Sequence, residues 1–159
     1  MKKLYSIVVF MALAFIVFAC KNEANTVIKT EAIRFTKEGE LSIFKKDSLL
    51  VHLDIEIAES DYETQTGLMH RSSMEEKQAM LFIFDGLEMH NFHMKNTQIP
   101  LDIIFIDDKL QIASFQENAK PYDEGLLTSQ VPVQYVLEIN AGLAEKWILE
   151  VGDRISFTR

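Results

Sequence analysis

The sequence is poor in cysteine, in long apolar runs and in basic charge, and each shortage excludes a class of protein. Cys20 is the only cysteine among 159 residues, so the chain cannot form an internal disulfide. The uncharged run from Leu4 to Ala19 is shorter than the ~20 apolar residues that a membrane-spanning helix needs. Lysine and arginine total 16 against 24 acidic residues, and the resulting net charge of −8 argues against binding to nucleic acid.

The N-terminus instead has the pattern of an export signal. Lys2 and Lys3 precede the uncharged run, which is typical of a cleavable secretory signal over residues 1–19. The sequence that follows, Val17-Phe18-Ala19-Cys20, resembles the bacterial lipobox, although Phe18 is larger than the residue usual there. The resemblance implies that Cys20 carries a lipid anchor. We therefore expect an exported protein anchored to a membrane of the bacterial cell envelope.

Residues 20–40 are expected to form the lipidated cysteine and a flexible tether, and residues 41–159 to form one domain. Strands are indicated by apolar residues at every second position, as in Val51-His52-Leu53-Asp54-Ile55. We expect strands within 33–43, 51–57, 80–84, 90–95, 101–106, 110–115, 134–139 and 154–157. No alternation of strands and helices of the parallel α/β kind is visible.

Two short helical segments complete the secondary structure. Ser60 lies three residues before Glu63, and this capping-box spacing predicts a short helix. A single helical turn is expected within residues 140–147. Short strands separated by turn signals such as Asp85-Gly86 favour a mainly β domain, a sandwich of jelly-roll type, with these two helical pieces.

Five motifs resemble those of a bacterial and archaeal family known as domain of unknown function 192. The motifs are Gly67–Arg71, Ala79–Phe82, Phe92–Asp102, Leu137–Gly142 and Gly152-Asp153. The resemblance implies a compact jelly-roll sandwich and brings no established function. Ala79 and His93 stand where the family pattern has glycine and tryptophan, so this chain is expected to differ in what it binds if that tryptophan contacts a ligand.

A polar cluster is the main candidate site. Asp102 shares a strand face with Ile104 and Ile106, and a carboxylate on an apolar face needs a partner, for which Arg71 and Lys95 are the candidates. The remaining members of the cluster are Asn96, Thr97 and Glu138. One interpretation is a buried polar staple that holds a loop crossing. The other is a ligand pocket in which Arg71 and Lys95 meet an anionic or hydroxyl-bearing ligand.

Two further alternatives stay open at this stage. His90, His93 and Met94 offer imidazole and thioether ligands suited to copper, but strand alternation places His93 opposite the other two. Asp102 and Glu138 would form a hydrolase pair if their carboxyl groups faced one cleft. No nucleophile elbow, zinc-protease motif or phosphate loop is present, so catalysis finds little support and no cofactor is indicated. The expected role is non-catalytic binding of a small molecule, a glycan or an envelope protein.

Overall fold

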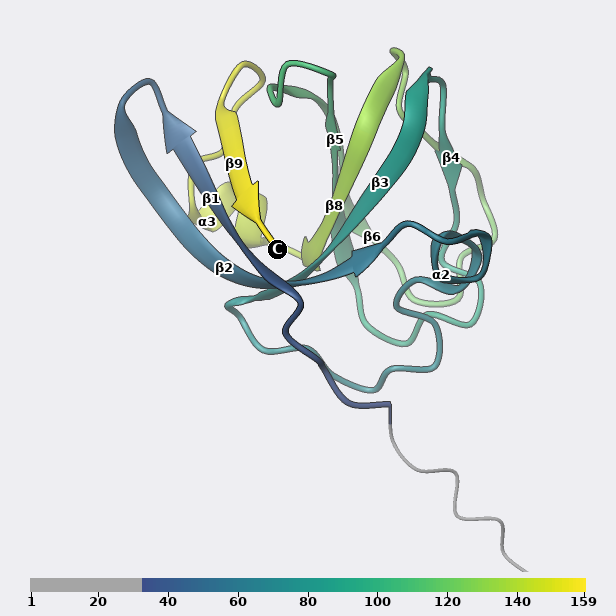
Figure 1. Cartoon of the computed structure of the whole chain (residues 1–159). Coiled ribbons are helices and arrows are strands. Elements are labelled where there is room, and N and C mark those ends of the chain that lie inside the picture. The colour runs from purple at the N-terminus through teal and green to yellow at the C-terminus, as the bar shows by residue number, and fades with distance from the viewer. Residues whose placement is uncertain (1–32) are drawn as a thin grey trace, which may run out of the picture. The chain divides into compact units, whose positions relative to one another are not determined.

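The computed structural model of the chain describes residues 33–159, which form a curled β domain with two short helices (Figure 1). Its elements are β1 (Gly39–Lys45), β2 (Ser48–Ala58), α2 (Asp61–Thr66), β3 (Gln78–Glu88), β4 (Asn91–Phe92), β5 (Leu101–Ile106), β6 (Ile112–Ala119), β7 (Leu127–Thr128), β8 (Val133–Asn140), α3 (Leu143–Lys146) and β9 (Arg154–Thr158). The mainly β prediction, with one short helix and one helical turn, is confirmed.

Seven strands form one sheet in the order β6-β5-β8-β3-β2-β1-β9, and β4 pairs with β7 in a separate two-stranded sheet. The large sheet curls so that its halves face each other, as in a sandwich (Figure 1). Its two edges meet where Ile112 N–H donates to Asp153 O at 2.9 Å and Ile155 N–H donates to Leu110 O at 2.8 Å. The Gly152-Asp153 motif therefore lies where the curled sheet closes.

Strand β5 shows why the domain has two apolar cores. All six of its residues are buried, because both of its faces are covered. Ile104 and Ile106 belong to the core inside the curled sheet, to which all seven strands contribute. Ile103 and Phe105 belong to a second core on the outer face of β3, β5 and β8, under the loops that carry α2 and β4. The polar candidate residues lie on both sides of this divide.

The structure corrects one expectation about topology. β2 and β3 are adjacent and parallel, with Ile55 opposite Ala79 and Ile57 opposite Leu81. Antiparallel neighbours can be joined by a tight turn, whereas parallel neighbours need a longer crossover. Residues 59–77 provide that crossover and include α2. The chain therefore contains one strand–helix–strand unit that the alternation of its sequence did not reveal.

Three local expectations also need correction. Asp85-Gly86 lies inside β3 rather than in a turn, at the irregularity that shifts the β3–β8 register between Ile83 and Glu88. The strand expected over residues 90–95 is limited to the two residues of β4, because a tight turn follows. The first strand is β1, which begins at Gly39 and continues past the end of the expected range at residue 43.

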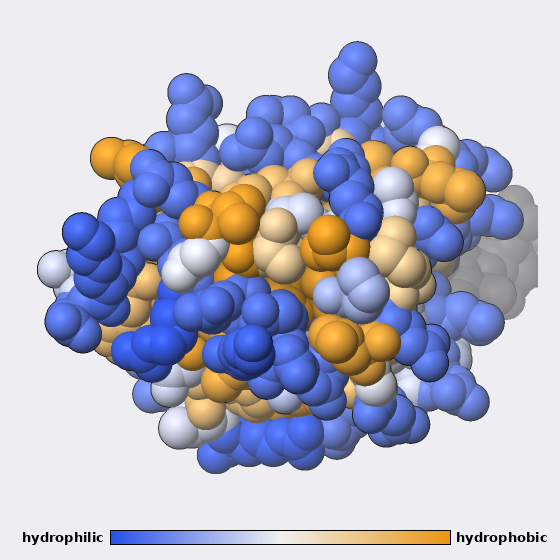
Figure 2. Space-filling view, turned by 90° about the horizontal axis from the view of Figure 1, so that it is seen from above, coloured by the Kyte–Doolittle hydropathy of each residue, from blue (hydrophilic) through white to orange (hydrophobic). Residues whose placement is uncertain are grey.

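The expected signal of residues 1–19 and the lipid-bearing Cys20 lie outside the described residues. Within residues 33–159, the helices are too short to span a bilayer. Seen from above, the surface of the domain is a mixture of hydrophilic and hydrophobic residues (Figure 2). This view gives no single apolar face, so the concave features of the domain are the more informative ones.

Candidate binding pocket

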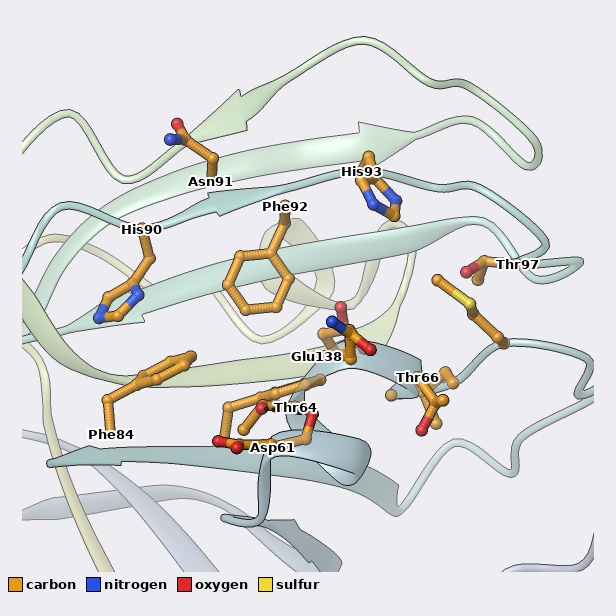
Figure 3. Close-up of a pocket in the computed structure, with 15 residues that line it drawn as sticks. Asp61, Thr64, Thr66, Phe84, His90, Asn91, Phe92, His93, Thr97 and Glu138 are labelled. Atoms are coloured by element: carbon orange, nitrogen blue, oxygen red, sulfur yellow. Dashed lines mark hydrogen bonds between the residues drawn. The ribbon is translucent and has the colours of Figure 1, made fainter.

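A pocket of about 430 Å³ opens on the outer face of the large sheet, between α2 and the segment that contains β4 (Figure 3). It is lined by Asp61, Thr64, Gln65, Thr66, Gly67, Leu68, Met69, Phe82, Phe84, His90, Asn91, Phe92, His93, Thr97 and Glu138. Cavities of this size and mixed lining are typical of sites for small ligands. Four of the five motifs of the sequence contribute residues to it.

Helix α2 forms one wall and is fixed at both ends by its own sequence. The predicted capping box is present: Ser60 Oγ accepts from Glu63 N–H, and Glu63 Oε2 accepts from Ser60 N–H at 3.0 Å. The helix ends at Gly67, whose N–H donates to Glu63 O at 2.7 Å. Gly67 has φ +44°, and a Cβ there would lie 2.8 Å from Phe82 Cζ. Only glycine lets this loop approach the sheet so closely.

Glu138 lies at the sheet side of the pocket. It stands on β8 between Met80 of β3 and Ile103 of β5, and only 6 % of its surface is exposed. No group among the described residues donates a hydrogen bond to its carboxyl, and burial raises the pKa of this carboxyl to about 8. A buried polar group without a partner is costly to the fold, so its presence calls for an explanation.

Aromatic rings form much of the remaining wall. Phe92 meets Phe82 edge to face, with centroids 5.1 Å apart, and meets Phe84 in the same manner at 6.5 Å. His90 stacks on Phe84 at 3.7 Å, and its Nε2 is buried without a hydrogen-bond partner. Burial lowers the pKa of His90, which favours the neutral ring. Phe92 and Glu138 point into the same space, with Phe84 and His90 toward one side and Thr97 toward the other (Figure 3).

The Met94-Lys95-Asn96-Thr97 block is a tight turn at the rim of this pocket. Thr97 N–H donates to Met94 O at 3.0 Å, and Asn96 adopts φ +57°. The Asn96 carbonyl accepts from His70 N–H at 2.9 Å, which joins the Gly67–Arg71 and Phe92–Asp102 motifs. Thr97 is buried and lines the pocket, whereas Lys95 and Asn96 are exposed and line no pocket described here. Lys95 and Asn96 therefore belong to the turn and do not face the pocket.

The sequence suggests Arg71 or Lys95 as the partner of Asp102, but the Asp102 carboxyl pairs with neither. Its Oδ1 accepts from Asn118 N–H at 2.8 Å, and its Oδ2 accepts from Ala144 N–H at 3.0 Å. The β5–β6 pairing is irregular at this point, which leaves the Asn118 amide without a ladder partner. Asp102 is 1 % exposed and fastens β6 and α3 to β5 inside the curled sheet. It is a structural staple that uses backbone amides in place of cationic side chains.

Arg71 has a different partner and a different cavity. Its Nη1 lies 2.6 Å from Glu56 Oε2, and both side chains are at least nine-tenths buried. Glu56 also accepts from Thr36 N–H at 2.8 Å. Both residues line a second cavity of about 400 Å³ that does not include Lys95. The structure therefore does not place Arg71 and Lys95 in one pocket, because Arg71 is paired in a buried site and Lys95 is on an exposed turn.

The three copper candidates do not converge. His90 and His93 line the pocket, whereas Met94 is 1 % exposed and packs in the outer core. Within residues 33–159, no three or more His, Cys, Asp or Glu side chains gather as a metal site. Asp102 and Glu138 do not converge either, since Asp102 pairs in register with Ile139, the neighbour of Glu138. The hydrolase that would use these two carboxylates together is excluded by this geometry.

Several pocket residues were not anticipated from the sequence. Phe82, Phe84 and Phe92 were read as strand residues without a site, and Asp61 and Thr64 as parts of a capped helix. The sequence signal for Phe82 and Phe84 is their spacing of two residues, which places both side chains on one face of a strand. Nothing in the sequence indicates that α2 folds over that face. The crossover between the parallel strands β2 and β3 places α2 there, and it brings together residues that lie far apart in the chain.

Comparison with known proteins places the chain beside others without a stated activity. It matches the family of uncharacterized ACR proteins named DUF192 over residues 42–157. It is similar to a protein of unknown function from Novosphingobium aromaticivorans DSM 12444, with 33% identity over 74% of this chain and 83% of that one and a TM-score of 0.71. A structure from Sinorhizobium meliloti 1021 described as "a putative transcription regulator" is 31% identical over 79% and 98% of the chains, with a TM-score of 0.73. No curated protein matches the chain.

Proposed function

The chain belongs to the DUF192 family, and we propose that it is a binding protein of the bacterial cell envelope that holds a small ligand in the pocket between α2 and β4. The observation that carries this proposal is the carboxyl of Glu138, which is 6 % exposed, opens to the pocket and accepts no hydrogen bond from the described residues. Proteins satisfy nearly all of their buried polar groups. A ligand that donates to this carboxyl would satisfy it.

One further unpaired polar atom supports the same conclusion. The Nε2 of His90 is buried without a partner and belongs to the same wall. The pocket combines aromatic surface with a few polar groups that converge, which is how small-molecule sites obtain both affinity and orientation. The proposal assigns no catalytic step, because the two carboxylates expected to cooperate lie on opposite faces of β5 and β8.

Attachment to the membrane is the second part of the proposal. Lys2 and Lys3, the uncharged run and Cys20 together support export followed by lipidation of the cysteine. Residues 21–32 would then lie between the lipid and the domain. The pocket would face a compartment outside the cytoplasm, so its ligand would be a small molecule or glycan of the envelope, or a group on an envelope protein.

Native mass spectrometry of the full-length chain tests the binding proposal directly. The protein would be extracted in detergent from an expressing bacterium, without chelators. We expect wild type to retain an additional mass. Thr64→Trp, which fills the pocket from α2, should lose that mass. Ser73→Trp is a matched control on an exposed residue that lines neither pocket, and it should retain the mass. A bare protein in every case, or equal retention by Thr64→Trp, would contradict the proposal.

A further inference from the structure

The charges that line the pocket are of one sign. Glu138 and Asp61 are its two carboxyl residues, and none of its lining residues is a lysine or an arginine. The outer-face neighbours of Glu138 on β3 and β5, Met80, Phe82 and Ile103, are apolar. The other titratable groups that face the cavity are His90 and His93, from the segment around β4. The pocket therefore offers a carboxyl group and no fixed cation to neutralise it.

Phe82 is buried behind Phe92, whereas Phe84 and Phe92 are partly exposed and line the pocket. The planes of Phe82 and Phe92 are 89° apart and those of Phe84 and Phe92 are 84° apart. The face of an aromatic ring carries negative electrostatic potential and attracts cations, above all in desolvated sites. A partly exposed aromatic ring beside a carboxyl suits an alkylated ammonium group, whose methyl groups contact the ring while its charge meets the acid.

We propose that the pocket between α2 and β4 binds an organic cation through an ammonium group placed against Phe92 and the carboxyl of Glu138. This rests on the proposed function and names the chemical class of its ligand. The cation supplies the partner that Glu138 lacks within residues 33–159, and it accounts for the lack of basic residues in the lining.

The ionisation behaviour of the site agrees with this geometry. Because the pKa of Glu138 is raised to about 8 by burial, the free site holds a mostly neutral acid at pH 7. Ionising it at pH 7 requires a shift of only about one pKa unit, which an adjacent positive charge readily provides. Burial lowers the pKa of His90, so this ring stays neutral and does not repel the ligand. Binding of a permanent cation should therefore strengthen as pH rises toward the pKa of Glu138.

Isothermal titration of the full-length chain in detergent with three ammonium probes tests the proposal. The probes are tetramethylammonium, choline and butylammonium, and the uncharged control is 3,3-dimethylbutan-1-ol, which has the shape of choline. We expect at least one ammonium probe to bind at least tenfold more tightly than the alcohol. For a quaternary probe, whose charge does not titrate, affinity should rise roughly tenfold from pH 7 to pH 9 as Glu138 ionises.

Two variants separate the parts of the site. Glu138→Gln keeps the shape of the carboxyl group and should lower ammonium affinity at least tenfold and abolish its rise with pH. Phe92→Leu should weaken the quaternary probes, and Glu117→Gln on the exposed part of β6 should change nothing. Failure of all three probes to bind, equal binding of the alcohol, or affinity that falls with rising pH would overturn the cation proposal. A retained neutral mass that Thr64→Trp abolishes would overturn it while leaving the binding function intact.

Discussion

Asp102 and Glu138 lie on the adjacent strands β5 and β8, yet their carboxyl groups are on opposite faces of the sheet. In the register of these strands Asp102 is opposite Ile139 and Glu138 is opposite Ile103. Asp102 points into the curled sheet, where two backbone amides satisfy it, and Glu138 points to the outer pocket, where no donor reaches it. Two acidic residues of similar burial thus have different roles, one structural and one available to a ligand.

Replacing Asp102 should destabilise the fold without affecting the pocket. In Asp102→Asn one of the two oxygens becomes an amide group that cannot accept from a backbone N–H. We expect a loss of about 2 kcal/mol in the free energy of unfolding, the scale of a buried hydrogen bond to a charged group. Chemical denaturation of the variant against Asp108→Asn, on the exposed hairpin turn, measures this loss. Equal unfolding midpoints would show that the bonds to Asn118 and Ala144 contribute nothing.

Glu138 should make the stability of the protein depend on pH. Its folded pKa of about 8 exceeds the ordinary value of 4.5, so the folded state prefers the protonated acid. The free energy of unfolding of wild type, relative to that of Glu138→Gln, is therefore highest below the unfolded pKa. It declines as pH rises from there through the folded pKa, by up to ~1.4 kcal/mol per pH unit. Unfolding curves of both proteins at pH 5 and pH 9 measure the difference. A stability of wild type relative to Glu138→Gln that is the same at both pH values, or that is higher at pH 9, would contradict the assignment.

Gly67 should tolerate no side chain. Its φ of +44° disfavours residues with a Cβ, and an added Cβ would lie 2.8 Å from Phe82. Gly67→Ala should lower the free energy of unfolding by about 1–3 kcal/mol and displace the wall of the pocket. Gly86→Ala is the matched control, because a Cβ there meets nothing within 4 Å and should cost less than about 1 kcal/mol. Comparable losses in both variants would mean that the approach to Phe82 is not the cause.

Cys20 should determine where the protein resides. We expect Cys20→Ala to leave the precursor uncleaved or to release the protein from membranes, because no acyl chain can then be attached. Fractionation of cells that express each form, with immunoblotting of both fractions, measures this. Cys20→Ser serves as a conservative second variant and should behave in the same way. A processed Cys20→Ala protein that stays in the membrane fraction would refute lipidation as the anchor.

Local sequence predicted much of the secondary structure, for identifiable reasons. The alternation of Val51, Leu53 and Ile55 in β2 reports directly which side chains face a core, and the Ser60–Glu63 capping box appears as its spacing predicts. The unbroken apolar run of β5 correctly indicated a strand, and the structure shows that it is covered on both faces. The expectation that failed around Asp85-Gly86 did so because pairing with β8 extended the strand through a turn signal.

The partners of the polar residues were beyond the reach of the sequence. Arg71, Lys95 and Asp102 were expected to meet because their charges are complementary, and each lies in a different environment. Complementary charge does not specify distance, and the backbone amides that satisfy Asp102 carry no signature in the sequence. Family membership, in contrast, follows from the motifs themselves and covers residues 42–157.

The sequence by itself determined the mainly β class, the helix that begins at Asp61 and the family, because these depend on short-range periodicity and on motifs. Only the tertiary structure decided that the sheet closes between β6 and β9, and that α2 covers the outer face beside Glu138. The physical reason is that a site is formed by contacts between residues far apart in the chain. Those contacts depend on strand order and crossover, which local preference does not encode.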